Sequence, residues 1–458
     1  MNRLNYNLFC FKRVFVTVTL FVVWASALTG SAASLAPDAQ QEKIAALLAK
    51  ALPQIHLNRL PCDDQIAMSA LDLLLNALDY EHGYFLATDI AQCRSEASTL
   101  DDQLKEGKVD FAYTVYELFK KRVSDRVEYV DTLLDEGFTF DKKETYVWKR
   151  KNAPWPADET EWNEIWRKKI KNEYVARVVA KQLAGEEAAS EKKENKETES
   201  ASEAQEAKLT PEEGIRKSYK QFLTVLNDND STWVLERYLT SFTQAYDPHT
   251  DYLSANNAED FAISMKLSLV GIGALLSTED GAAKVERLIP GGPAERDGRL
   301  KAGDKIIAVA QGKDSPVDVL HWPLSKTVRL IRGKKNTKVV LTVLPASDLS
   351  GSTIKKIDLI RDEVKLEEQA AKSKTMDITG GDEVTRTLGI ITLPEFYADL
   401  QAERSGKTEA RSASRDVRRL IDELKEKGVQ GIVLDLRNNG GGSLNEAVEL
   451  TGFFIIAS

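Results

Sequence analysis

The spacing of apolar residues predicts helices over the first half of the chain. Between about residues 39 and 246, apolar positions recur every three or four residues, as at Leu71, Leu75 and Leu78. This is the period of an amphipathic helix. Trp162 and Trp166 lie four positions apart, on one face of such a helix, and we predict that both pack in the core.

A segment of different composition interrupts this helical region at residues 184–209. It consists almost entirely of Glu, Ala, Lys, Ser, Asn and Gln, and it has no aromatic residue. Such a segment cannot bury enough apolar surface to offset the entropy that ordering costs. We therefore expect a solvated insert, partly helical or disordered, within a helical domain.

After about residue 264 the pattern changes to short apolar runs separated by glycine turns. Short runs of this kind, rich in β-branched residues, are typical of strands. The expected strands cover residues 267–276, 284–288, 306–310 and 339–344. They predict a compact β-rich unit that ends near Pro345. A charged connector follows, in which residues 365–374 have helical character.

The last segment alternates strands and helices. We expect strands at residues 388–393 and 432–436, the second of them buried, helices at 413–427 and 443–452, and a third strand at 453–456. This βαβα order predicts a layered α/β domain. Because a sheet does not normally stop at its newest strand, we expect the sequence to be shorter than the fold to which it belongs.

Length, composition and charge narrow the class of protein. A chain of 458 residues suggests about three domains. Hydrophobic residues make up 42% and charged residues 29% of the chain, which is typical of a soluble globular protein. The formal net charge of −9 argues against nucleic-acid binding, because phosphate contacts need a basic face.

The first 33 residues have the pattern of a secretory signal peptide. Arg3, Lys12 and Arg13 form a positive start, residues 14–24 are apolar, and residues 31–33 are small. The apolar run is too short to span a bilayer. An uncleaved membrane anchor is the alternative interpretation.

An exported protein meets oxidising conditions, and two cysteines follow the predicted signal peptide. Cys62 and Cys93 are therefore either a disulfide pair or two buried thiols. The sequence leaves both possibilities open.

A glycine-rich loop in the β-rich unit predicts a peptide-binding site. Residues 269–275 read Leu-Val-Gly-Ile-Gly-Ala-Leu. The backbone N–H groups of such a loop can face inward and hold a carboxylate. The strand that follows offers an edge to which a peptide can add. A helix at residues 324–331 can wall this groove with Val328 and Ile331.

Two further turns support this interpretation. Residues 290–295, Pro-Gly-Gly-Pro-Ala-Glu, lead into a short helix, and residues 300–307, Leu-Lys-Ala-Gly-Asp-Lys-Ile-Ile, lead into a strand. Together these segments resemble a PDZ domain of the bacterial protease type over residues 259–346. A small β-domain with ordinary glycine turns is the alternative. The resemblance implies that a peptide C-terminus is received at Val270, Gly271, Ile272 and Gly273.

A second glycine motif lies near the end of the chain. Residues 435–442 read Asp-Leu-Arg-Asn-Asn-Gly-Gly-Gly, between a predicted strand and a predicted helix. Ser443 and Glu446 have the spacing of a capping box, which marks the start of that helix. Such a turn is a phosphate or dinucleotide site, a purely structural turn, or an oxyanion hole. Its spacing matches neither nucleotide-binding glycine motif.

This second motif resembles the signature of the C-terminal processing peptidases. Two other segments resemble their tail-specific protease branch: residues 246–254, Tyr-Asp-Pro-His-Thr-Asp-Tyr-Leu-Ser, and residues 153–156, Ala-Pro-Trp-Pro. The order of the predicted domains also matches that branch. The resemblance implies a multidomain α+β protein. It comprises a helical domain at 34–258, a PDZ domain at 259–346, and the start of a crotonase-like layered α/β protease domain at 347–458.

The resemblance also implies a catalytic mechanism. In this family, glycines of the signature contribute to the oxyanion hole, and Gly441 and Gly442 match best. Asp435 and Arg437 are expected to brace the strand and the turn. The family uses a serine nucleophile and a lysine base that lie downstream of the signature. We therefore expect both beyond Ser458, and we assign neither within the chain.

No second catalytic or metal site is predicted. His249 lies between Asp247 and Asp251, but carboxylates two positions away in a proline-containing turn suit local turn hydrogen bonds better. No zinc-binding spacing of Cys or His residues occurs in the sequence. We expect neither metal nor cofactor.

The resemblance implies a periplasmic tail-specific serine endopeptidase that recognises apolar C-termini through its PDZ domain. The 458 residues alone are expected to be inactive. The alternative is a truncated product or pseudoprotease that binds C-termini without cutting them. The expected partners are C-terminal segments of substrates and a possible lipoprotein adaptor, with at most peripheral contact with the inner membrane.

Overall fold

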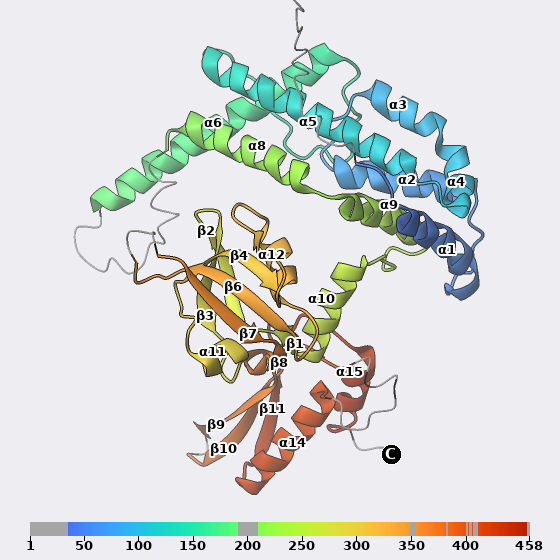
Figure 1. Ribbon diagram of the computed structural model, residues 1–458. Coiled ribbons are helices and arrows are strands. Elements are labelled where there is room, and N and C mark those ends of the chain that lie inside the picture. The colour runs from blue at the N-terminus through green and yellow to red at the C-terminus, as the bar shows by residue number, and fades with distance from the viewer. Residues whose placement is uncertain are drawn as a thin grey trace, which may run out of the picture.

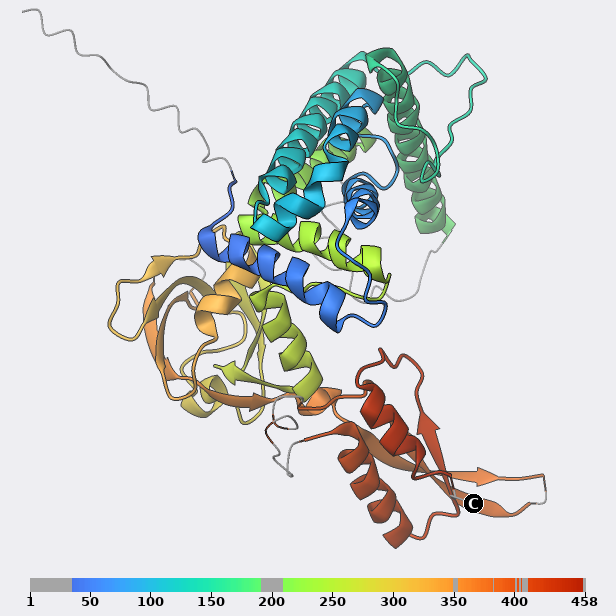
Figure 2. The ribbon, with the colours of Figure 1, turned by 90° about the vertical axis from the view of Figure 1, so that its right-hand side faces the viewer.

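The computed structural model describes residues 35–190, 209–348, 353–381, 383–399, 402, 405 and 411–455. The described chain forms three bodies: a helical arch, a β-rich body beneath it, and a smaller α/β body beyond that (Figures 1 and 2). This confirms the predicted fold class. The predicted signal peptide and residues 191–208 of the insert lie outside the described residues. Within these ranges, no helix has both the length and the apolar character that crossing a membrane requires.

The helical arch contains the helices that the apolar spacing predicts for the first half of the chain. Its helices are α1 (Ala39–Ile55), α2 (Asp64–Leu78), α3 (Ala87–Ser95), α4 (Leu100–Glu106), α5 (Asp110–Glu136), α6 (Glu159–Ser190), α8 (Pro211–Asp228) and α9 (Ser231–Tyr246), with a 3₁₀ turn at Ala97–Thr99. Helix α6 runs to Ser190, so the first residues of the predicted insert are helical. Helix α10 (Ala255–Lys266) leads out of the arch to the β-rich body.

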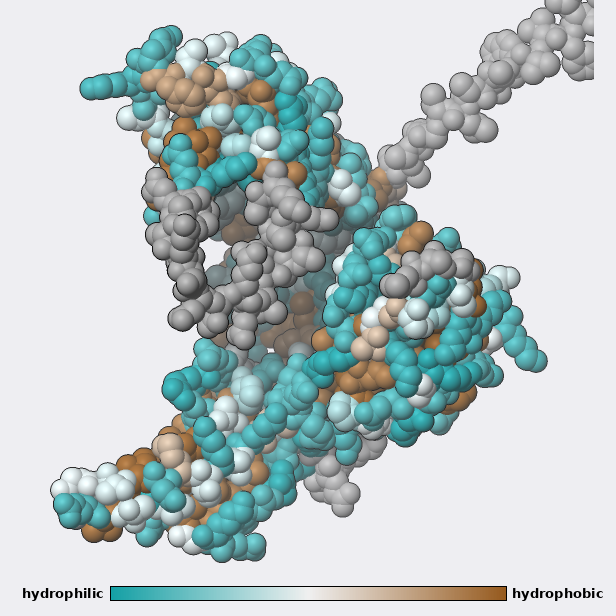
Figure 3. Space-filling view, turned by 90° about the vertical axis from the view of Figure 1, so that its left-hand side faces the viewer, coloured by the Kyte–Doolittle hydropathy of each residue, from teal (hydrophilic) through white to brown (hydrophobic). Residues whose placement is uncertain are grey.

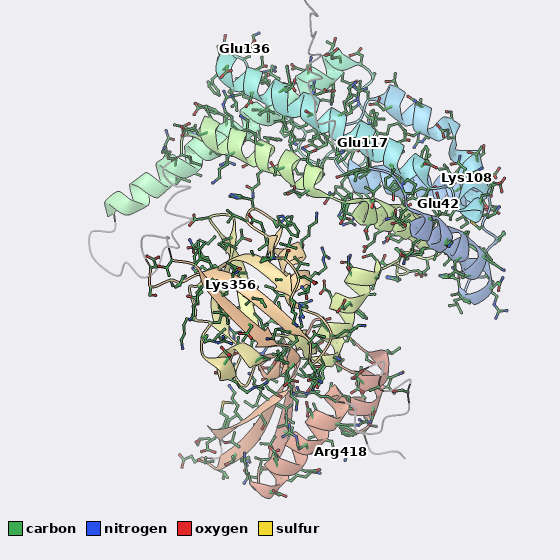
Figure 4. The ribbon with its side chains drawn as sticks, viewed as in Figure 1. Glu42, Lys108, Glu117, Glu136, Lys356 and Arg418 are labelled. Carbon is green, nitrogen blue, oxygen red and sulfur yellow. The ribbon has the colours of Figure 1, made fainter. Side chains whose placement is uncertain are left out.

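Local capping explains where several of these helices begin. Asp38 accepts hydrogen bonds from the backbone N–H groups of Gln40 and Gln41, both at 2.8 Å. Thr210 and Glu213 form a reciprocal capping box at α8. Glu42 and Lys108 lie at the same end of the arch (Figure 4). There Gly107, at φ +80°, packs so closely on the Glu42 carbonyl that a Cβ would lie 2.6 Å from its oxygen.

The arch has an aromatic core around a buried turn after α2. Trp162 and Trp166 are buried, as predicted, and both indole N–H groups donate to the Gly83 carbonyl at 2.7 Å. His82 stacks on Trp155, with ring centroids 3.7 Å apart. The turn therefore joins α2 to the start of α6, which is remote from it in sequence.

The two cysteines are buried free thiols, so the disulfide alternative is wrong. They lie in different parts of the arch core. Cys62 lies just before α2, whereas Cys93 lies on α3. Burial raises the pKa of the Cys93 thiol to about 11, which keeps it protonated and unreactive at neutral pH.

The β-rich body is an antiparallel sheet with two short helices. Its elements are β1 (Ser268–Gly271), β2 (Ala274–Glu279), β3 (Ala282–Leu288), α11 (Pro293–Asp297), β4 (Lys305–Gln311), β5 (Val317–Asp318), α12 (Leu324–Ile331), β6 (Lys338–Leu344), β7 (Lys355–Ile360) and β8 (Asp362–Lys365). The main sheet has the order β2-β3-β4-β6-β7, with β5 paired to β4. Strand β8 pairs with β1.

The sheet of this body continues past the boundary predicted at residue 346, because β7 pairs along its whole length with β6. One prediction about the connector that follows is wrong. The helix expected at residues 365–374 does not form. Residues 362–365 pair with β1, a 3₁₀ turn follows at Glu367–Gln369, and β9 begins at Lys372. Pairing with a strand almost a hundred positions earlier overrides the local helical pattern.

The third body has the predicted layered arrangement. Strands β9 (Lys372–Thr379), β10 (Thr385–Thr392) and β11 (Gly431–Asp435) form a sheet in the order β11-β10-β9, and helices α14 (Ala413–Glu426) and α15 (Leu444–Thr451) follow β10 and β11 respectively. Strands β10 and β11 are parallel, with Leu388 opposite Gly431. Gly389 lets α14 approach, because a Cβ there would lie 2.6 Å from the Leu424 side chain.

Two predictions fail at the end of this body. Strand β11 is not buried, because it is an edge strand and the face of the described sheet that carries Val433 and Met376 is exposed. The strand expected at 453–456 is absent over residues 453–455. Phe453 and Phe454 donate to the carbonyls of Leu450 and Thr451 and so continue the turn of α15. The Arg418 guanidinium lies 3.9 Å from the centre of the Phe453 ring and holds this turn on α14 (Figure 4).

Candidate functional site

The loop at residues 271–273 presents two backbone donors. The Ile272 carbonyl accepts from Ala294 N–H at 2.8 Å, and the Gly273 carbonyl accepts from Ile289 N–H at 2.9 Å. Both carbonyls therefore point into the body. The N–H groups of Ile272 and Gly273 have no acceptor among the described residues. Two adjacent free amides of this kind can bind a carboxylate.

Glycine is required at one position of this loop. Gly273 has φ +75°, and a Cβ there would lie 3.0 Å from the Cα of Gly292. Gly292 begins the turn that carries Ala294, so the two turns pack backbone against backbone. This contact explains why both the loop and the Pro-Gly-Gly-Pro turn are present in the sequence.

Next to this loop, β2 and α12 lie side by side, and we call the strip between them the peptide groove. Strand β2 is an edge of the described sheet, and only its β3 side is paired. Leu324, Val328 and Ile331 recur along one face of α12, and Ala274 and Leu276 of β2 belong to the same apolar cluster. An extended peptide can therefore pair with the free edge of β2 and rest its side chains against α12.

The structure assigns different roles to the residues predicted for this site. Val328 is half-buried and walls the groove, whereas Ile331 and the Ile272 side chain are buried in the core beneath it. Gly271 ends β1, opposite Asp362. Val270 lies on β1 before the loop, where it pairs with Glu363 and lines a cavity against α10. Sequence reasoning missed Leu324, although its spacing from Val328 is helical.

The glycine triplet forms a turn that lies against Phe396. Gly440 N–H donates to the Pro394 carbonyl at 3.1 Å, and Ser443 N–H donates to the Phe396 carbonyl at 2.8 Å. Phe396 N–H donates in return to the Gly441 carbonyl at 2.7 Å. The turn is therefore held on both sides by backbone hydrogen bonds.

The two predicted oxyanion donors differ in this turn. Gly441 N–H already donates to the Asn439 side chain at 2.8 Å, and Asn439 in turn donates to the Leu393 carbonyl at 2.9 Å. Gly442 N–H has no acceptor among the described residues. Gly442 is therefore the better placed of the two donors, and Asn439 is a supporting residue that the sequence analysis did not identify.

The capping box expected at Ser443 and Glu446 is only half formed. The Ser443 hydroxyl accepts from Glu446 N–H at 3.4 Å. The Glu446 carboxylate, 4% exposed, instead accepts from Ser414 N–H at 2.6 Å, in the first turn of α14. A carboxylate is favoured there by the unpaired N–H groups and the helix dipole. Glu446 thus joins the starts of α14 and α15 just after the glycine turn.

Asp435 and Arg437 brace the turn, as the sequence suggested. The Asp435 carboxylate accepts from Arg437 N–H at 3.1 Å and from its guanidinium at 2.9 and 2.7 Å. These hydrogen bonds lower the pKa of Asp435 to about 2. The Arg437 side chain is 86% exposed, so solvent screens the pair and its contribution to stability is small.

Replacing Arg437 by glutamine should raise the pKa of Asp435 from about 2 toward its ordinary value of 3.8. A depressed carboxyl pKa stabilises the fold above the ordinary value, and this stabilisation is lost as the pH falls toward 2. The variant should therefore change acid stability slightly and neutral stability hardly at all. NMR titration of the Asp435 carboxyl carbon would measure the pKa. Lys374→Gln is the matched control, because Lys374 contributes least among the causes. An unchanged pKa in Arg437→Gln would contradict the prediction.

The histidine motif is a local turn. His249 N–H donates to the Asp247 carboxylate at 2.8 Å, as the sequence suggested. Thr250 bonds to His56 through its hydroxyl at 3.1 Å, which ties this segment to the end of α1. No cluster of three or more His, Cys, Asp or Glu side chains suited to a metal is found in the described part of the chain.

A short segment joins the peptide groove to the glycine turn. Leu366 N–H donates to the Leu267 carbonyl at 2.9 Å, and Ala398 N–H donates to the Met265 carbonyl at 2.7 Å. The first bond follows β8 and the second lies just after Phe396. Figure 3 shows the surface hollowed between the arch and the bodies beneath it. Residues of α8, α9, α10 and α12 line a cavity between the arch and the β-rich body.

Comparison with known families divides the chain into the same three parts. The tail specific protease N-terminal domain matches residues 48–256, the PDZ domain matches residues 262–344, and peptidase family S41 matches residues 387–458.

Individual relatives agree with these matches. The tail-specific protease of Haemophilus influenzae is 33% identical over 405 residues, which are 88% of this chain and 52% of that protein. The carboxy-terminal processing protease CtpA of Bacillus subtilis is 29% identical over 53% of this chain and 45% of its own length. The chain thus spans about half the length of these curated relatives. A solved PDZ domain of a Vibrio cholerae carboxy-terminal protease, in complex with peptide, is 40% identical over 22% of this chain and all of that chain, with a TM-score of 0.21.

Proposed function

Because the chain belongs to the tail-specific protease family of C-terminal processing peptidases, we propose that it is part of an exported serine endopeptidase. This enzyme captures proteins by an apolar C-terminus in the PDZ groove and cleaves the captured chain. The signal-like pattern of residues 1–33 supports a periplasmic location. A lipoprotein adaptor remains an expectation from the family alone.

One observation carries the binding half of this proposal. The free amides of Ile272 and Gly273 lie at the start of β2, whose outer edge is unpaired and faces the apolar side of α12. A terminal carboxylate accepts from the two amides, and the preceding residues add to β2 as a further strand. The last side chain then lies against Val328, toward the end of α12 that is next to the loop, and earlier side chains of the peptide reach Leu324. Only a chain end satisfies this arrangement, since an internal residue has no carboxylate there.

The cleavage half of the proposal rests on Gly442. Its free N–H group is a donor for the oxygen that becomes negative in the tetrahedral intermediate. The serine nucleophile and lysine base are those of the family, and we place them downstream of residue 458. On this proposal the 458 residues bind peptides without cleaving them. If the natural product proves to end there, the alternative of a non-catalytic binding protein takes its place, and the intact mass of the native protein distinguishes the two.

The binding proposal predicts a strong preference for a free C-terminus. A peptide ending in leucine should bind the chain from residue 34 at least about tenfold more tightly than the same peptide with an amidated end, because charge-assisted hydrogen bonds to a carboxylate are worth about 1.5–3 kcal/mol. Isothermal titration calorimetry would measure both affinities. Equal binding of the two peptides would overturn the proposal.

A matched pair of variants locates the site. Val328→Asp places a charge in the groove and should abolish detectable binding of the leucine-ended peptide. Ile354→Asp makes the same change at an exposed residue beside β7, at the opposite edge of the sheet from β2, and should leave binding unchanged. Similar affinities in the two variants would place the peptide elsewhere.

A further inference from the structure

Arg361 is a buried arginine that makes only neutral hydrogen bonds in the described part of the chain. It is 2% exposed and lies between β7 and β8. Its guanidinium donates to the carbonyls of Leu330 and Ile331 at 2.9 and 2.8 Å, and to the Gln311 side chain at 2.6 Å. It also donates to Thr337 at 2.9 Å. The planar fork of an arginine suits several acceptors in fixed directions.

These acceptors include the end of α12, the helix that walls the peptide groove. Leu330 and Ile331 are its last two residues, and carbonyls at a helix C-terminus have no partner within the helix. A cation there also opposes the negative end of the helix dipole. Gly333 leaves room for the guanidinium, since a Cβ at that position would lie 3.0 Å from the Arg361 Nε.

The residues after Arg361 hold the other side of the groove. Asp362 pairs with Gly271 and Glu363 with Val270, so the strand that leads into the carboxylate loop is bonded to this segment. Residues 361–363 therefore contact both the helical wall and the loop that offers the free amides. They lie beyond the PDZ match at 262–344 and within the part that the sequence analysis described as a charged connector.

Stability alone does not explain a buried cation at this place. Burying a charge is costly, and replacement of buried ions by apolar residues of similar size is often neutral or stabilising. An arginine fixes geometry in a way that an apolar residue does not, because its five N–H groups define directions. The acceptors here lie on three different elements, β4, α12 and β6 with its preceding turn.

We propose that Arg361 is a positioning residue of the peptide groove. Its guanidinium fixes the last turn of α12 relative to β2 and so sets the width available to the final side chain of the bound peptide. This inference rests on the proposed peptide-binding function. It also implies that the functional peptide-binding unit extends about twenty residues past the family match.

The test compares two side chains at the peptide end. Peptides ending in leucine and in alanine are titrated into the whole chain and into its Arg361→Met and Arg361→Lys variants. In Arg361→Met the affinity for the leucine-ended peptide should fall about tenfold and that for the alanine-ended peptide much less, since apolar pocket contacts distinguish side chains by factors of about 10–200. The affinity of Arg361→Lys for the leucine-ended peptide should lie between those of the wild type and Arg361→Met. Preference for a free over an amidated end should persist, because the amides of Ile272 and Gly273 are intact.

Controls separate positioning from general damage. Arg299 is half-exposed and bonds to Asp297 and to Asp358 of β7 but not to α12, so Arg299→Met should keep the wild-type ratio of affinities. Gln311 is exposed, and its side chain accepts from Arg361 and donates to the Leu330 carbonyl. Gln311→Ala should bring the affinities for the leucine-ended and alanine-ended peptides closer together. This variant supplies the measurement if Arg361→Met does not fold.

The outcomes are distinguishable. An unchanged leucine-to-alanine ratio in both Arg361→Lys and Gln311→Ala overturns this inference alone, provided that the wild type prefers the free carboxylate. If the wild-type chain binds free and amidated peptides equally well, both the proposed function and this inference are overturned. A narrowed ratio with retained carboxylate preference supports the positioning role, since general unfolding would lower both together.

Discussion

Gly442→Ala is expected to destabilise the third body by about 3 kcal/mol or more, because strained backbone alone costs about 1–3 kcal/mol and a direct clash adds to it. Gly442 has φ +130°, and a Cβ there would lie 2.4 Å from the Phe396 carbonyl oxygen. That oxygen accepts from Ser443 N–H, and Phe396 N–H donates to Gly441. The clash is therefore with backbone that is held on both sides and cannot rotate away.

The neighbouring glycines provide matched controls for this prediction. Gly440 has open space around a Cβ and an ordinary φ, so Gly440→Ala should change stability by no more than about 0.5 kcal/mol. Gly441 also has open space but has φ +96°, so Gly441→Ala should cost about 1–2 kcal/mol. Native-state hydrogen exchange of β10 and β11 would measure the three changes, because a chain of several bodies does not unfold in one transition. Equal effects at the three positions would contradict the prediction.

The same series tests the proposed oxyanion role in the complete protease. Removing one oxyanion donor typically lowers turnover by about a hundredfold to a thousandfold. Gly442→Ala moves the only triplet amide that lacks an acceptor among the described residues, so turnover should fall at least that far. Gly440→Ala should leave turnover near the wild-type value. Full activity in Gly442→Ala would place the donor elsewhere.

Periodicity predicted most of the fold because the elements concerned are locally encoded. The arch helices repeat their apolar positions over several turns. Helix α14 ends at Glu426, close to the predicted residue 427, and Gly428 follows its C-cap at φ +74°. The connector at residues 365–374 was mispredicted because its structure depends on distant partners. Lys365 pairs with Ser268, and Leu366 bonds to Leu267. No local pattern contains that information.

At the candidate sites, the sequence predicted the motifs but not the hydrogen bonds that their atoms make. Both glycine motifs were identified, but a sequence does not show which amide is already occupied. The N–H group of Gly441 is occupied, unlike that of Gly442, because the Asn439 side chain folds back onto it. The Ser-x-x-Glu spacing correctly marked the start of α15, yet the Glu446 carboxylate bonds to Ser414, which lies in another helix. Arg361 lies in a segment with no motif, and its role depends wholly on long-range contacts.

Stability of the arch depends strongly on one carboxylate. Asp79, 2% exposed, accepts from the N–H groups of Gly83, Tyr84 and Phe85 at 2.8, 3.0 and 3.0 Å. It also accepts from the Trp155 indole at 3.1 Å. The turn that it holds presents the Gly83 carbonyl to Trp162 and Trp166. One side chain therefore organises the contact between α2 and the start of α6.

Asp79→Ala should destabilise the arch by about 3–5 kcal/mol, because it leaves four donors without an acceptor and each buried unpaired donor costs about 1–3 kcal/mol before water enters. Hydrogen exchange at Tyr84, Phe85 and along α6 would measure the loss of stability. Exchange there should become faster under conditions in which exchange in the β-rich body is unchanged. Asp72→Ala is the matched control. Asp72 is 51% exposed and bonds to Arg94, itself exposed, so its loss should cost no more than about 0.5 kcal/mol. An arch that keeps its protection in Asp79→Ala would show that the tryptophan contacts hold the turn without the carboxylate.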